Sequence, residues 1–373
     1  MKLGVLKEQS PEKRVVLMPE SVKTLVALKA EVLVEKGAGA RAFVDDKEYT
    51  EAGAKLVDRK TILAESDVLL KIDPFSAEDI KETDASKVLL AAMNPFSNIE
   101  MVTRLAEKKI TSFSLELVPR ISRAQSMDIL SSMATVAGYR AVLDAALHLP
   151  RFFPMFMSAA GTIKPAKVLI LGAGVAGLQA IAIARKLGAV VEVFDVRSAV
   201  KEEVKSLGGK FIEVEGATED ASAGGYAVEQ TEDFKQKQSQ MIQDHAVKSD
   251  VVICTAQIPG RKAPVLLKKE TVEQMKGGSV IIDLAASTGG NCELTKNDEE
   301  YIHNGVTIIG NSAYASDMQI DASSMFGKNV VNLLKLMIDE EGNLNLDFED
   351  DVISGTCLTH GGEIKNERVK SMI

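Results

Sequence analysis

The sequence predicts an α/β protein with two Rossmann-like domains, each a doubly wound parallel sheet, joined by long helices. Three observations support this fold class: a length of 373 residues, a hydrophobic content of 46%, and two series of short β-rich runs separated by helix-patterned segments. Because one domain usually takes roughly 100–200 residues, this length indicates two domains. Strands that alternate with helices are typical of parallel sheets.

The first series of β-rich runs lies near the N-terminus. It consists of GVLKE, EVLVEKG, DVLLKID, KVLLAAMN and TSFSLE. Helix-patterned segments such as PESVKTLVALKA follow several of them. We therefore expect a first, discontinuous domain that comprises residues 1–130 and, after a second long helix has crossed back, residues 325–373. The alternative is a C-terminal tail that decorates the second domain.

The second series predicts a complete dinucleotide-binding fold within residues 140–320, after a connecting helix over residues 122–148. Its six runs are KVLILG, VVEVFD, GKFIEV, DVVICT, SVIIDL and VTIIG, and six parallel strands are what this fold requires. The long polar segment 215–240, between the third and fourth runs, predicts a mobile loop that closes over a ligand. A tolerated surface insertion is the alternative.

Composition excludes several classes of partner. The chain has 44 basic and 53 acidic residues and a net charge of -9, so no general basic field favours nucleic acid. Its three cysteines lie far apart without ligand-spaced histidines, which favours a reducing compartment and no metal site. The longest charge-free apolar stretch, 168–184, is interrupted by glycines and is too short for a bilayer. We expect no direct membrane insertion.

A glycine motif marks the candidate nucleotide site. Gly172, Gly174 and Gly177 follow the run VLIL and open a helix-patterned segment, and the next run ends at Asp195. In the dinucleotide-binding fingerprint, the glycines allow a tight turn, close approach of a pyrophosphate, and close packing of helix on strand. Val175, Ala176 and Val196 lie within these turns. A glycine turn without a ligand is the alternative.

Asp195 favours NAD(H) over NADP(H), because a carboxylate accepts hydrogen bonds from the ribose 2′-OH but repels a 2′-phosphate. Arg197 leaves the alternative open, since an arginine can pair with a 2′-phosphate. Later strand ends would supply the rest of the crevice. The candidates after the fourth run are Thr255, Ala256, Gln257, Pro259 and Leu266, and those after the fifth run are residues 283–290; each could also be an ordinary turn.

Histidines are scarce where a dehydrogenase would need one. An enzyme that oxidises a hydroxy or amino acid needs a general acid/base, most often His. The four histidines are His148, His245, His303 and His360, and none lies in residues 1–147. We interpret His148, His245 and His303 as surface or packing residues, and the charged segment NDEEYIHNG around His303 as helical. Direct hydride transfer between two nicotinamides requires no such group.

A polar cluster lies at the predicted domain junction. Arg120, Gln125, Asp128 and Ser131 are spaced three to five apart, so they would share one face of a helix. The alternative is a capping box in which Ser122 and Gln125 start the helix. Both interpretations can hold. The candidate binding residues in this segment are Arg120, Ser122, Arg123, Gln125, Asp128, Leu130 and Ser131.

Several motifs together resemble one family over essentially the whole chain. PRISRAQSMDILSS, AGYRAV, GAGVAGLQAIAIARKLGA, FDVR, GGYA and SGTCLTHGGEI are similar to the alpha subunit, or domain I, of proton-translocating NAD(P) transhydrogenases. The resemblance implies an NAD(H)-binding homodimer, peripheral at the cytoplasmic face of the inner membrane, or at the matrix side in an organelle. It also implies partner chains that carry an NADP(H)-binding domain III and a membrane-embedded domain II.

The resemblance also implies roles for single residues. Arg120, Gln125, Asp128 and Ser131 would contact the nicotinamide end, where hydride is transferred. Asp195 and Arg197 would hold the adenosine. Gly225 and Tyr226 would lie on the loop that closes over the nucleotide.

Alanine dehydrogenases are similar as well, through GVLKEQSPEKRVVLMPESV with Arg14 and DVLLKIDP with Lys71. In that family these two cations bind a carboxylate substrate, and a histidine and an aspartate transfer the proton. The corresponding segments here read VLLAAMNPF and DLAASTGG, so the proton-transfer pair is missing. We therefore expect hydride transfer from NADH to NADP⁺ on a partner domain. The alternatives are an alanine-type amino-acid dehydrogenase and a nucleotide-binding regulatory module.

Overall fold

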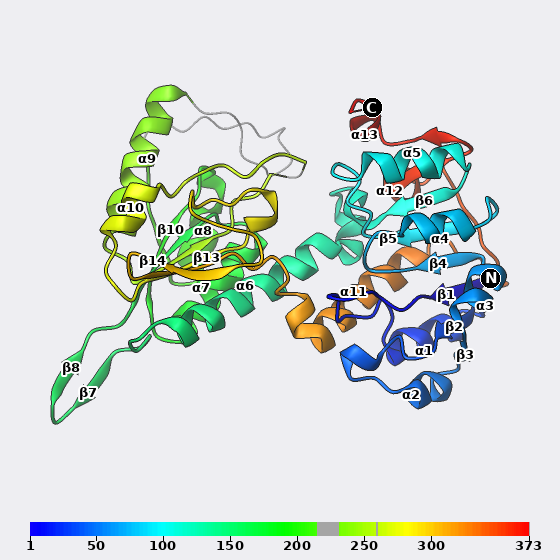
Figure 1. Cartoon of the computed structure of the whole chain (residues 1–373), viewed down its shortest axis with the longest axis horizontal. Helices are drawn as coiled ribbons and strands as arrows, with labels where there is room; N and C mark the ends of the chain where they lie inside the picture. The colour runs from blue at the N-terminus through cyan, green and yellow to red at the C-terminus, as the bar shows by residue number, and fades with distance from the viewer. Residues whose placement is uncertain (215–230, 259, 373) are drawn as a thin grey trace. The chain divides into compact units, whose positions relative to one another are not determined.

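The computed structural model describes residues 1–214, 231–258 and 260–372. Two compact units make up the chain (Figure 1). Unit 1 contains Met1–Met133 and Ala315–Ile373, so segments from both ends of the chain build it, and unit 2 contains Ala134–Tyr314. Each unit has a mainly parallel sheet with helices, which confirms the predicted fold class.

The sheet of unit 1 has eight strands in the order β17-β16-β6-β5-β4-β1-β2-β3. All pairs from β3 to β6 are parallel, and their order along the sheet is the 3-2-1-4-5-6 order of a dinucleotide-binding fold. Two antiparallel strands from the C-terminal segment extend it beyond β6. The strands are β1 (Lys2–Val5), β2 (Glu31–Glu35), β3 (Lys55–Val57), β4 (Val68–Leu70), β5 (Val88–Ala91), β6 (Thr111–Ser114), β16 (Cys357–His360) and β17 (Glu363–Ile364).

The helices of unit 1 include two that pack closely on each other. An added Cβ at Gly327 of α11 would lie 3.0 Å from Ser21 Oγ of α1 and 3.1 Å from the carbonyl oxygen of Val16, so a small residue is needed there. The helices are α1 (Pro19–Ala27), α2 (Asp46–Glu51), α3 (Arg59–Glu65), α4 (Ala77–Glu82), α5 (Ile99–Glu107), α11 (Gln319–Leu334), α12 (Asp351–Thr356) and α13 (Glu367–Lys370).

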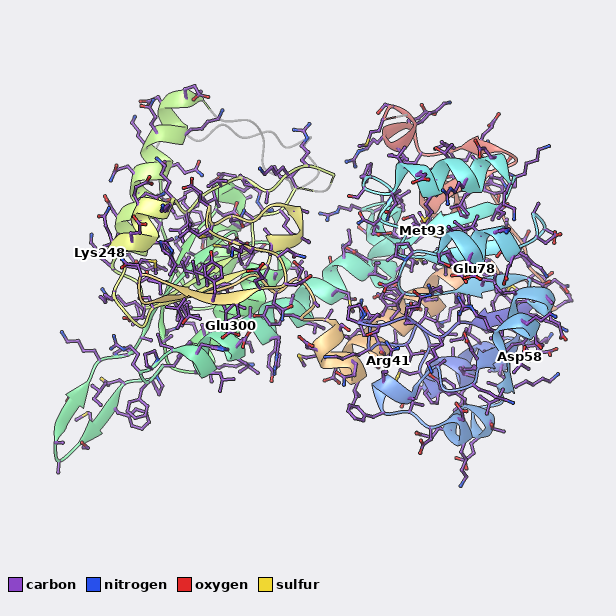
Figure 2. The ribbon with its side chains drawn as sticks, in the orientation of Figure 1. Arg41, Asp58, Glu78, Met93, Lys248 and Glu300 are labelled. Atoms are coloured by element: carbon purple, nitrogen blue, oxygen red, sulfur yellow. The ribbon has the colours of Figure 1, made fainter. Side chains whose placement is uncertain are left out.

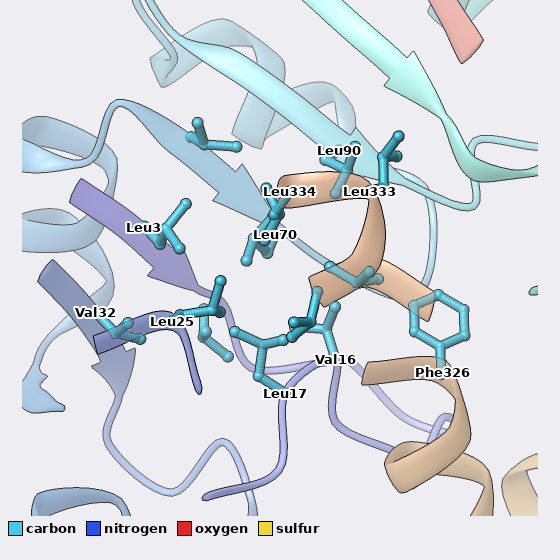
Figure 3. Packing of buried hydrophobic residues seen from close by; sticks show 14 of the residues in the cluster. Leu3, Val16, Leu17, Leu25, Val32, Leu70, Leu90, Phe326, Leu333 and Leu334 are labelled. Carbon is cyan, nitrogen blue, oxygen red and sulfur yellow. The ribbon is translucent and has the colours of Figure 1, made fainter. Parts of the chain in front are cut away.

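Helix α11 brings the C-terminal segment into the main core of unit 1. Phe326, Leu333 and Leu334 of this helix belong to one buried cluster with side chains of β1, β2, β4 and β5 (Figure 3). Two residues hold the N-terminal loop against the same region, because Ser323 Oγ accepts from the Val15 amide at 2.9 Å and Ser316 Oγ accepts from the Lys13 amide at 2.9 Å. The fold of the first domain therefore depends on the last part of the chain.

The sheet of unit 2 has seven strands in the order β11-β10-β9-β12-β13-β15-β14. The six strands predicted from the sequence are all present and all parallel, again in the 3-2-1-4-5-6 order. The strands are β9 (Lys167–Leu171), β10 (Val190–Phe194), β11 (Lys210–Phe211), β12 (Val251–Cys254), β13 (Val280–Asp283), β14 (Glu300–His303) and β15 (Val306–Ile309).

The edge strand β14 corrects one expectation. Its residues were expected to be helical because of their charge, but they pair antiparallel with β15. Asn304 and Gly305, with φ of 49° and 79°, form the two-residue turn between the strands. Asn-Gly favours this left-handed turn over continuation of a helix, so the dipeptide was the signal that decided the structure.

The helices of unit 2 include one that shortens the predicted loop. These helices are α7 (Val175–Lys186), α8 (Lys201–Ser206), α9 (Glu232–Ala246) and α10 (Lys269–Gln274). The final residues of the loop expected over 215–240 belong to α9, while 215–230 lie outside the described residues. Ile242 and Ala246, four residues apart on α9, are buried in the core of unit 2, which explains why this polar segment is helical.

One long helix, α6 (Ile129–His148), continues from unit 1 into unit 2. Helix α11 was expected to cross back, but the chain returns to unit 1 at Ala315 and α11 lies wholly in that unit. Before β9, β7 (Phe156–Ser158) and β8 (Gly161–Ile163) form a hairpin that projects from unit 2 (Figure 1). Among the described residues no helix is long and apolar enough to span a bilayer.

Candidate functional site

The turn between β9 and α7 has the geometry that its glycines predict. Gly172 has a φ of +104°, a conformation that side chains disfavour. A Cβ on Gly177 would lie 2.0 Å from the Gly172 carbonyl oxygen, so the helix can start this close to the strand only with glycine there. A Cβ on Gly174 would meet nothing within 4 Å. The fold itself thus requires glycine at positions 172 and 177. Gly174 instead faces open space, where the protein backbone could approach a bound ligand closely.

Helix α7 begins without a side-chain cap. Its N-cap residue is Gly174, which has no side chain to accept from the first helical amides, those of Val175 and Ala176. Unpaired amides and the helix dipole together favour an anion at such a position. With the open space at Gly174, they form a cradle that suits a phosphate group.

Asp195 joins the end of β10 to the glycine turn. Its Oδ2 accepts from the Ala173 amide at 2.7 Å, and its Oδ1 accepts from the Arg197 amide at 2.8 Å. The Arg197 guanidinium adds two hydrogen bonds, at 2.9 and 2.8 Å, and this bonding raises the pKa of Arg197 above its usual range. Val196, between them, packs on the core of unit 2. The arginine is therefore directed at the carboxylate of its own loop.

The loop after β12 lies against the same turn, and it is bonded to the loop after β13. Thr255 Oγ1 donates to the Gly172 carbonyl at 3.0 Å. Ala256 donates its amide to Asn291 Oδ1 at 3.0 Å, and Gln257 Nε2 donates to the Leu284 carbonyl at 2.7 Å. The structure thus brings Thr255 and Asp195 to the glycine turn, at the carboxyl ends of neighbouring strands.

Asn291 is a residue of this region that the sequence analysis missed. Its buried amide donates to the carbonyls of Ala256 at 2.9 Å and Pro264 at 2.8 Å, and its backbone carbonyl accepts from the Leu266 amide at 2.8 Å. One side chain therefore ties together the two loops that were expected to line the crevice. Nothing in the run GGNCE distinguishes this Asn, because its burial and its partners are set only by the fold.

Asp283, at the end of β13, holds the loop that carries Asn291. The carboxylate accepts from the amides of Ala285, Asn291 and Cys292 and from Thr295 Oγ1, at 2.6 to 2.9 Å. Burial raises the pKa of Asp283, and these hydrogen bonds oppose that shift. The group holds the loop and is wholly buried, so it is not exposed to a substrate.

The polar cluster of unit 1 does not form one helical face. Residues Ser122–Met127 form a short 3-10 helix, η3, whose N-cap is Ile121 without side-chain capping. Asp128 is extended, with φ of -75° and ψ of 97°, and α6 starts after it. Asp128, rather than Ser122, caps α6, because its carboxylate accepts from the Ser131 amide at 3.0 Å and from Ser131 Oγ at 2.6 Å. The predicted capping box and shared face are therefore wrong.

The cluster nevertheless presents several side chains to solvent. Arg123 forms a two-bond ion pair with Asp350, at 2.6 and 2.9 Å, so its charge is used within unit 1. Asp128 and Ser131 are half-buried. The exposed residues of the predicted set are Arg120, Ser122, Arg123, Gln125 and Leu130. Gly225, Tyr226 and Pro259 lie outside the described residues.

Each histidine has a partner away from the glycine turn. His148 Nε2 lies 3.0 Å from Glu300 of β14, a residue labelled in Figure 2. His245 pairs with Glu192 at 2.7 Å and His303 with Glu273 at 3.1 Å. His360 Nδ1 lies 3.0 Å from Thr111 Oγ1. These contacts agree with the expectation that His148, His245 and His303 are surface or packing residues.

The two cations shared with alanine dehydrogenases pair with carboxylates of unit 1 itself. Arg14 forms a fork with Glu12 at 2.8 and 2.7 Å, and both side chains are largely buried. Lys71 Nζ lies 3.8 Å from Glu8 and 3.9 Å from Asp79. The geometry supports a structural role for Arg14 and Lys71.

The end of β5, where a proton-transfer histidine would lie, is held differently here. The amides of Met93, labelled in Figure 2, and Asn94 donate to the half-buried carboxylate of Glu116 at 3.0 and 2.7 Å. Burial raises the pKa of Glu116. This carboxylate fixes the loop and carries out no evident acid/base task.

Comparison with known proteins places this geometry in a family. The family models for the N-terminal and C-terminal domains of alanine dehydrogenase/PNT match residues 4–137 and 141–367. Over 98% of its length the chain is 48% identical to an NAD(P) transhydrogenase alpha-subunit chain of Rhodospirillum rubrum, of which it covers 97%. The chain belongs to the NAD(P) transhydrogenase alpha-subunit family. It is also 42% identical to the alpha subunit of Haemophilus influenzae, of which it covers 71%.

Solved structures agree with membership of the transhydrogenase alpha-subunit family. A transhydrogenase from Sinorhizobium meliloti superimposes with a TM-score of 0.89 at 43% identity, covering 98% of this chain and 100% of that one. An L-alanine dehydrogenase shares the fold, with a TM-score of 0.82 at 24% identity over 100% of this chain and 98% of that one. Transhydrogenase alpha subunits are components of multi-subunit oxidoreductases, so partner subunits are implied.

The buried Glu8 gives this family member a testable pH dependence. Burial raises the pKa of Glu8 from 4.5 to about 7, and Lys71 opposes the shift. Between pH 4.5 and about pH 7, the folded state therefore binds more protons at Glu8 than the unfolded state does. The free energy of unfolding falls as the pH rises through this range. Glu8→Gln removes the ionisation. Its unfolding free energy minus that of the wild type should rise across this window, by at most about 3 kcal/mol.

Urea denaturation followed by circular dichroism, at about pH 5 and about pH 8, measures this difference. Glu78→Gln is the control, because Glu78 is exposed on α4 (Figure 2). The free energy of unfolding of this control minus that of the wild type should be the same at both pH values. A Glu8→Gln difference that stays constant between the two pH values would contradict the assignment.

Proposed function

We propose that the chain is the NAD(H)-binding component of a proton-translocating transhydrogenase. It would bind NADH at the carboxyl edge of the unit 2 sheet. An NADP(H)-binding domain III on another chain would accept the hydride, and a membrane-embedded domain II would couple the transfer to proton translocation. The observation that carries the proposal is the glycine turn, where an uncapped helix start, open space at Gly174 and the Asp195 carboxylate lie together.

The residues present fit an NAD(H) molecule. The amides at the start of α7 would neutralise the diphosphate, and Asp195 would accept from the adenosine ribose. Asp195 also repels a 2′-phosphate, and Arg197 is already paired with it, so the pair favours NAD(H) over NADP(H). Arg120, Gln125, Asp128 and Ser131 would orient the nicotinamide. Bound NADH supplies the hydride and leaves as NAD⁺, while NADP⁺ becomes NADPH.

No residue of the chain needs to transfer a proton in this reaction. This explains why the four histidines have partners elsewhere and why Glu116 holds the end of β5. The amino-acid dehydrogenase alternative requires a substrate-binding cation. Arg14 and Lys71 instead face Glu12 and Glu8. The described contacts thus support hydride transfer between nucleotides over that alternative.

Reconstitution tests the proposed function. The purified chain should catalyse hydride transfer from NADH to an NADP⁺-loaded domain III, followed with an acetyl-pyridine nucleotide analogue. NADH plus a 2-oxo acid and ammonia should give no steady oxidation with the chain alone. Oxidation in that second assay would establish the dehydrogenase alternative, and no transfer in the first would favour a regulatory module.

A substitution at Asp195 tests the assigned nucleotide site. Asp195→Ala should weaken NADH binding by about 1–3 kcal/mol, the contribution of a charge-assisted hydrogen bond. Because the variant also removes the repulsion of a 2′-phosphate, the ratio of NADH to NADPH affinity should fall. Fluorescence titration with both nucleotides measures the two effects.

Arg197→Ala is the matched control for loosening of the loop, since it leaves the bond from Asp195 to the Ala173 amide in place. It should change NADH affinity less than Asp195→Ala does. An unchanged nucleotide preference in Asp195→Ala would move the ribose contact to another residue.

We also propose that the chain forms a homodimer through the β7–β8 hairpin. Residues 152–163 contain no charged side chain, and Phe152, Phe156, Met157 and Ile163 are exposed. An isolated two-stranded hairpin is only marginally stable in water, and a large exposed apolar surface indicates an interaction site. A second copy would offer the same apolar surface across a two-fold axis.

Met157→Asp should therefore shift the chain toward the monomer, because it places a charge on the most exposed apolar side chain of the hairpin, 75% accessible. Phe43→Asp, at a 73% exposed position of unit 1, should leave the dimer intact. Sedimentation equilibrium distinguishes the two species. Equal behaviour of both variants would place the interface elsewhere.

The complex would lie at a membrane, with this chain peripheral to it. We expect the cytoplasmic face of an inner membrane, or the matrix side in an organelle. Fractionation of membranes with and without the partner chains tests this location: the chain should sediment with membranes only when the partners are present.

A further inference from the structure

The segment that carries Gln125 is held by two amides of α11. The backbone carbonyl of Ser126 accepts from Asn329 Nδ2 at 2.8 Å and from Asn332 Nδ2 at 3.2 Å. Asn329 and Asn332 are three residues apart, so they lie on one face of α11. A single carbonyl of η3 is thereby bonded twice from a helix that is distant in sequence.

Apolar contacts fix the inner side of the same segment. Ala124 and Met127, on either side of Gln125 and Ser126, are buried in one cluster with Phe326 and Val330 of α11. Gln125 is exposed between them. The inner face of η3 is thus attached to α11, and its outer face presents the side chain that is proposed to meet the nicotinamide.

A contribution to stability alone does not explain the asparagine at position 329. Its side chain is only 6% exposed, and its Oδ1 is buried without a hydrogen-bond partner among the described residues. A buried unpaired oxygen reduces stability, and an apolar side chain of similar size would avoid this loss. The N–H group of this amide is the part that forms a hydrogen bond, to the Ser126 carbonyl.

A second attachment of η3 is weaker. Arg123 pairs with Asp350, but the arginine side chain is about half exposed, at 49%. Exposed ion pairs contribute little to rigidity because water and salt screen them. The two asparagines therefore provide the main polar attachment of the segment.

We propose that Asn329 and Asn332 are positioning residues for hydride transfer. They hold the Ser126 carbonyl, which sets the positions of Gln125 before it and of Asp128 after it. Transfer between two nicotinamides requires their alignment to about an ångström, whereas nucleotide binding is spread over many contacts. The inference rests on the proposed function and assigns residues of α11 to it.

The variant Asn329→Leu/Asn332→Ala tests the inference. Leu fills the volume of Asn329 and removes both the N–H donor and the unpaired oxygen. We expect transfer at saturating NADH to domain III to fall about tenfold or more. NADH affinity should stay within about twofold, since the glycine turn is untouched, and the thermal midpoint should change little. Lys328→Ala, an exposed neighbour on α11, should behave as wild type.

Amide hydrogen exchange gives a readout that needs no nucleotide. In the free chain, a peptide covering residues 120–128 should exchange faster in the double variant than in the wild type and Lys328→Ala, while peptides from β9 and α7 should not change. Asn332→Ala alone should show a smaller change in the same direction, and Asn332→Gln, which keeps the amide donor, should restore most of the rate. These milder variants keep the test valid if the double variant folds poorly.

Three outcomes would overturn the proposal. They are a wild-type transfer rate in the double variant, unchanged exchange in residues 120–128, and parallel losses of rate, affinity and stability in the milder variant Asn332→Ala. Absence of transfer with the wild-type chain and domain III would instead overturn the proposed function, and this inference with it.

Discussion

The close approach of α7 to the end of β9 is the constraint on which the candidate site depends. It is possible only because Gly177 has no Cβ to meet the Gly172 carbonyl. With the helix start held there, the Ala173 amide reaches Asp195, and Thr255 bonds to Gly172. Three strand ends are thereby joined around one turn. The geometry of this turn and of its contacts with Asp195 and Thr255 follows from the absence of one methyl group.

Unit 1 repeats the strand order of unit 2 but uses the corresponding turn differently. After β1 the chain has Glu8 in place of a glycine motif, and its buried carboxylate accepts from the amides of Ile72 at 2.6 Å and Asp73 at 3.4 Å. Lys71 lies beside it. A carboxylate from the loop after β1 therefore binds amides of the loop after β4, whereas in unit 2 the turn after β9 has a helix start without a side-chain cap. The same strand order thus accommodates two different arrangements of the turn after its first strand.

The sequence was sufficient for those features of the structure that local chemistry determines. The six parallel strands of unit 2 and the glycine turn follow from short apolar runs and fixed spacings. Expectations were wrong where a distant contact or a single turn decides: Asn304-Gly305 makes β14 a strand, and burial of Ile242 and Ala246 makes α9 a helix. Ser122 met the capping pattern, yet Asp128 caps α6, while Ser122 lies in η3, which is bonded to the distant helix α11. Asn291 could not be chosen in advance, because its partners lie in the loop after β12, which meets the loop of Asn291 only in the fold.

The construction of unit 1 from both ends of the chain has a consequence for synthesis on the ribosome. Unit 2 is continuous, so all of its strands are available once residue 314 has emerged. Unit 1 must wait for α11, β16 and β17, and until then the apolar face that Phe326 and Leu333 cover is open to solvent. Domains generally fold as units during translation, and exposed apolar surface invites aggregation in the interval. The domain made first would thus be the last to be completed, and during this interval it would be the region of the nascent chain that most needs protection by chaperones.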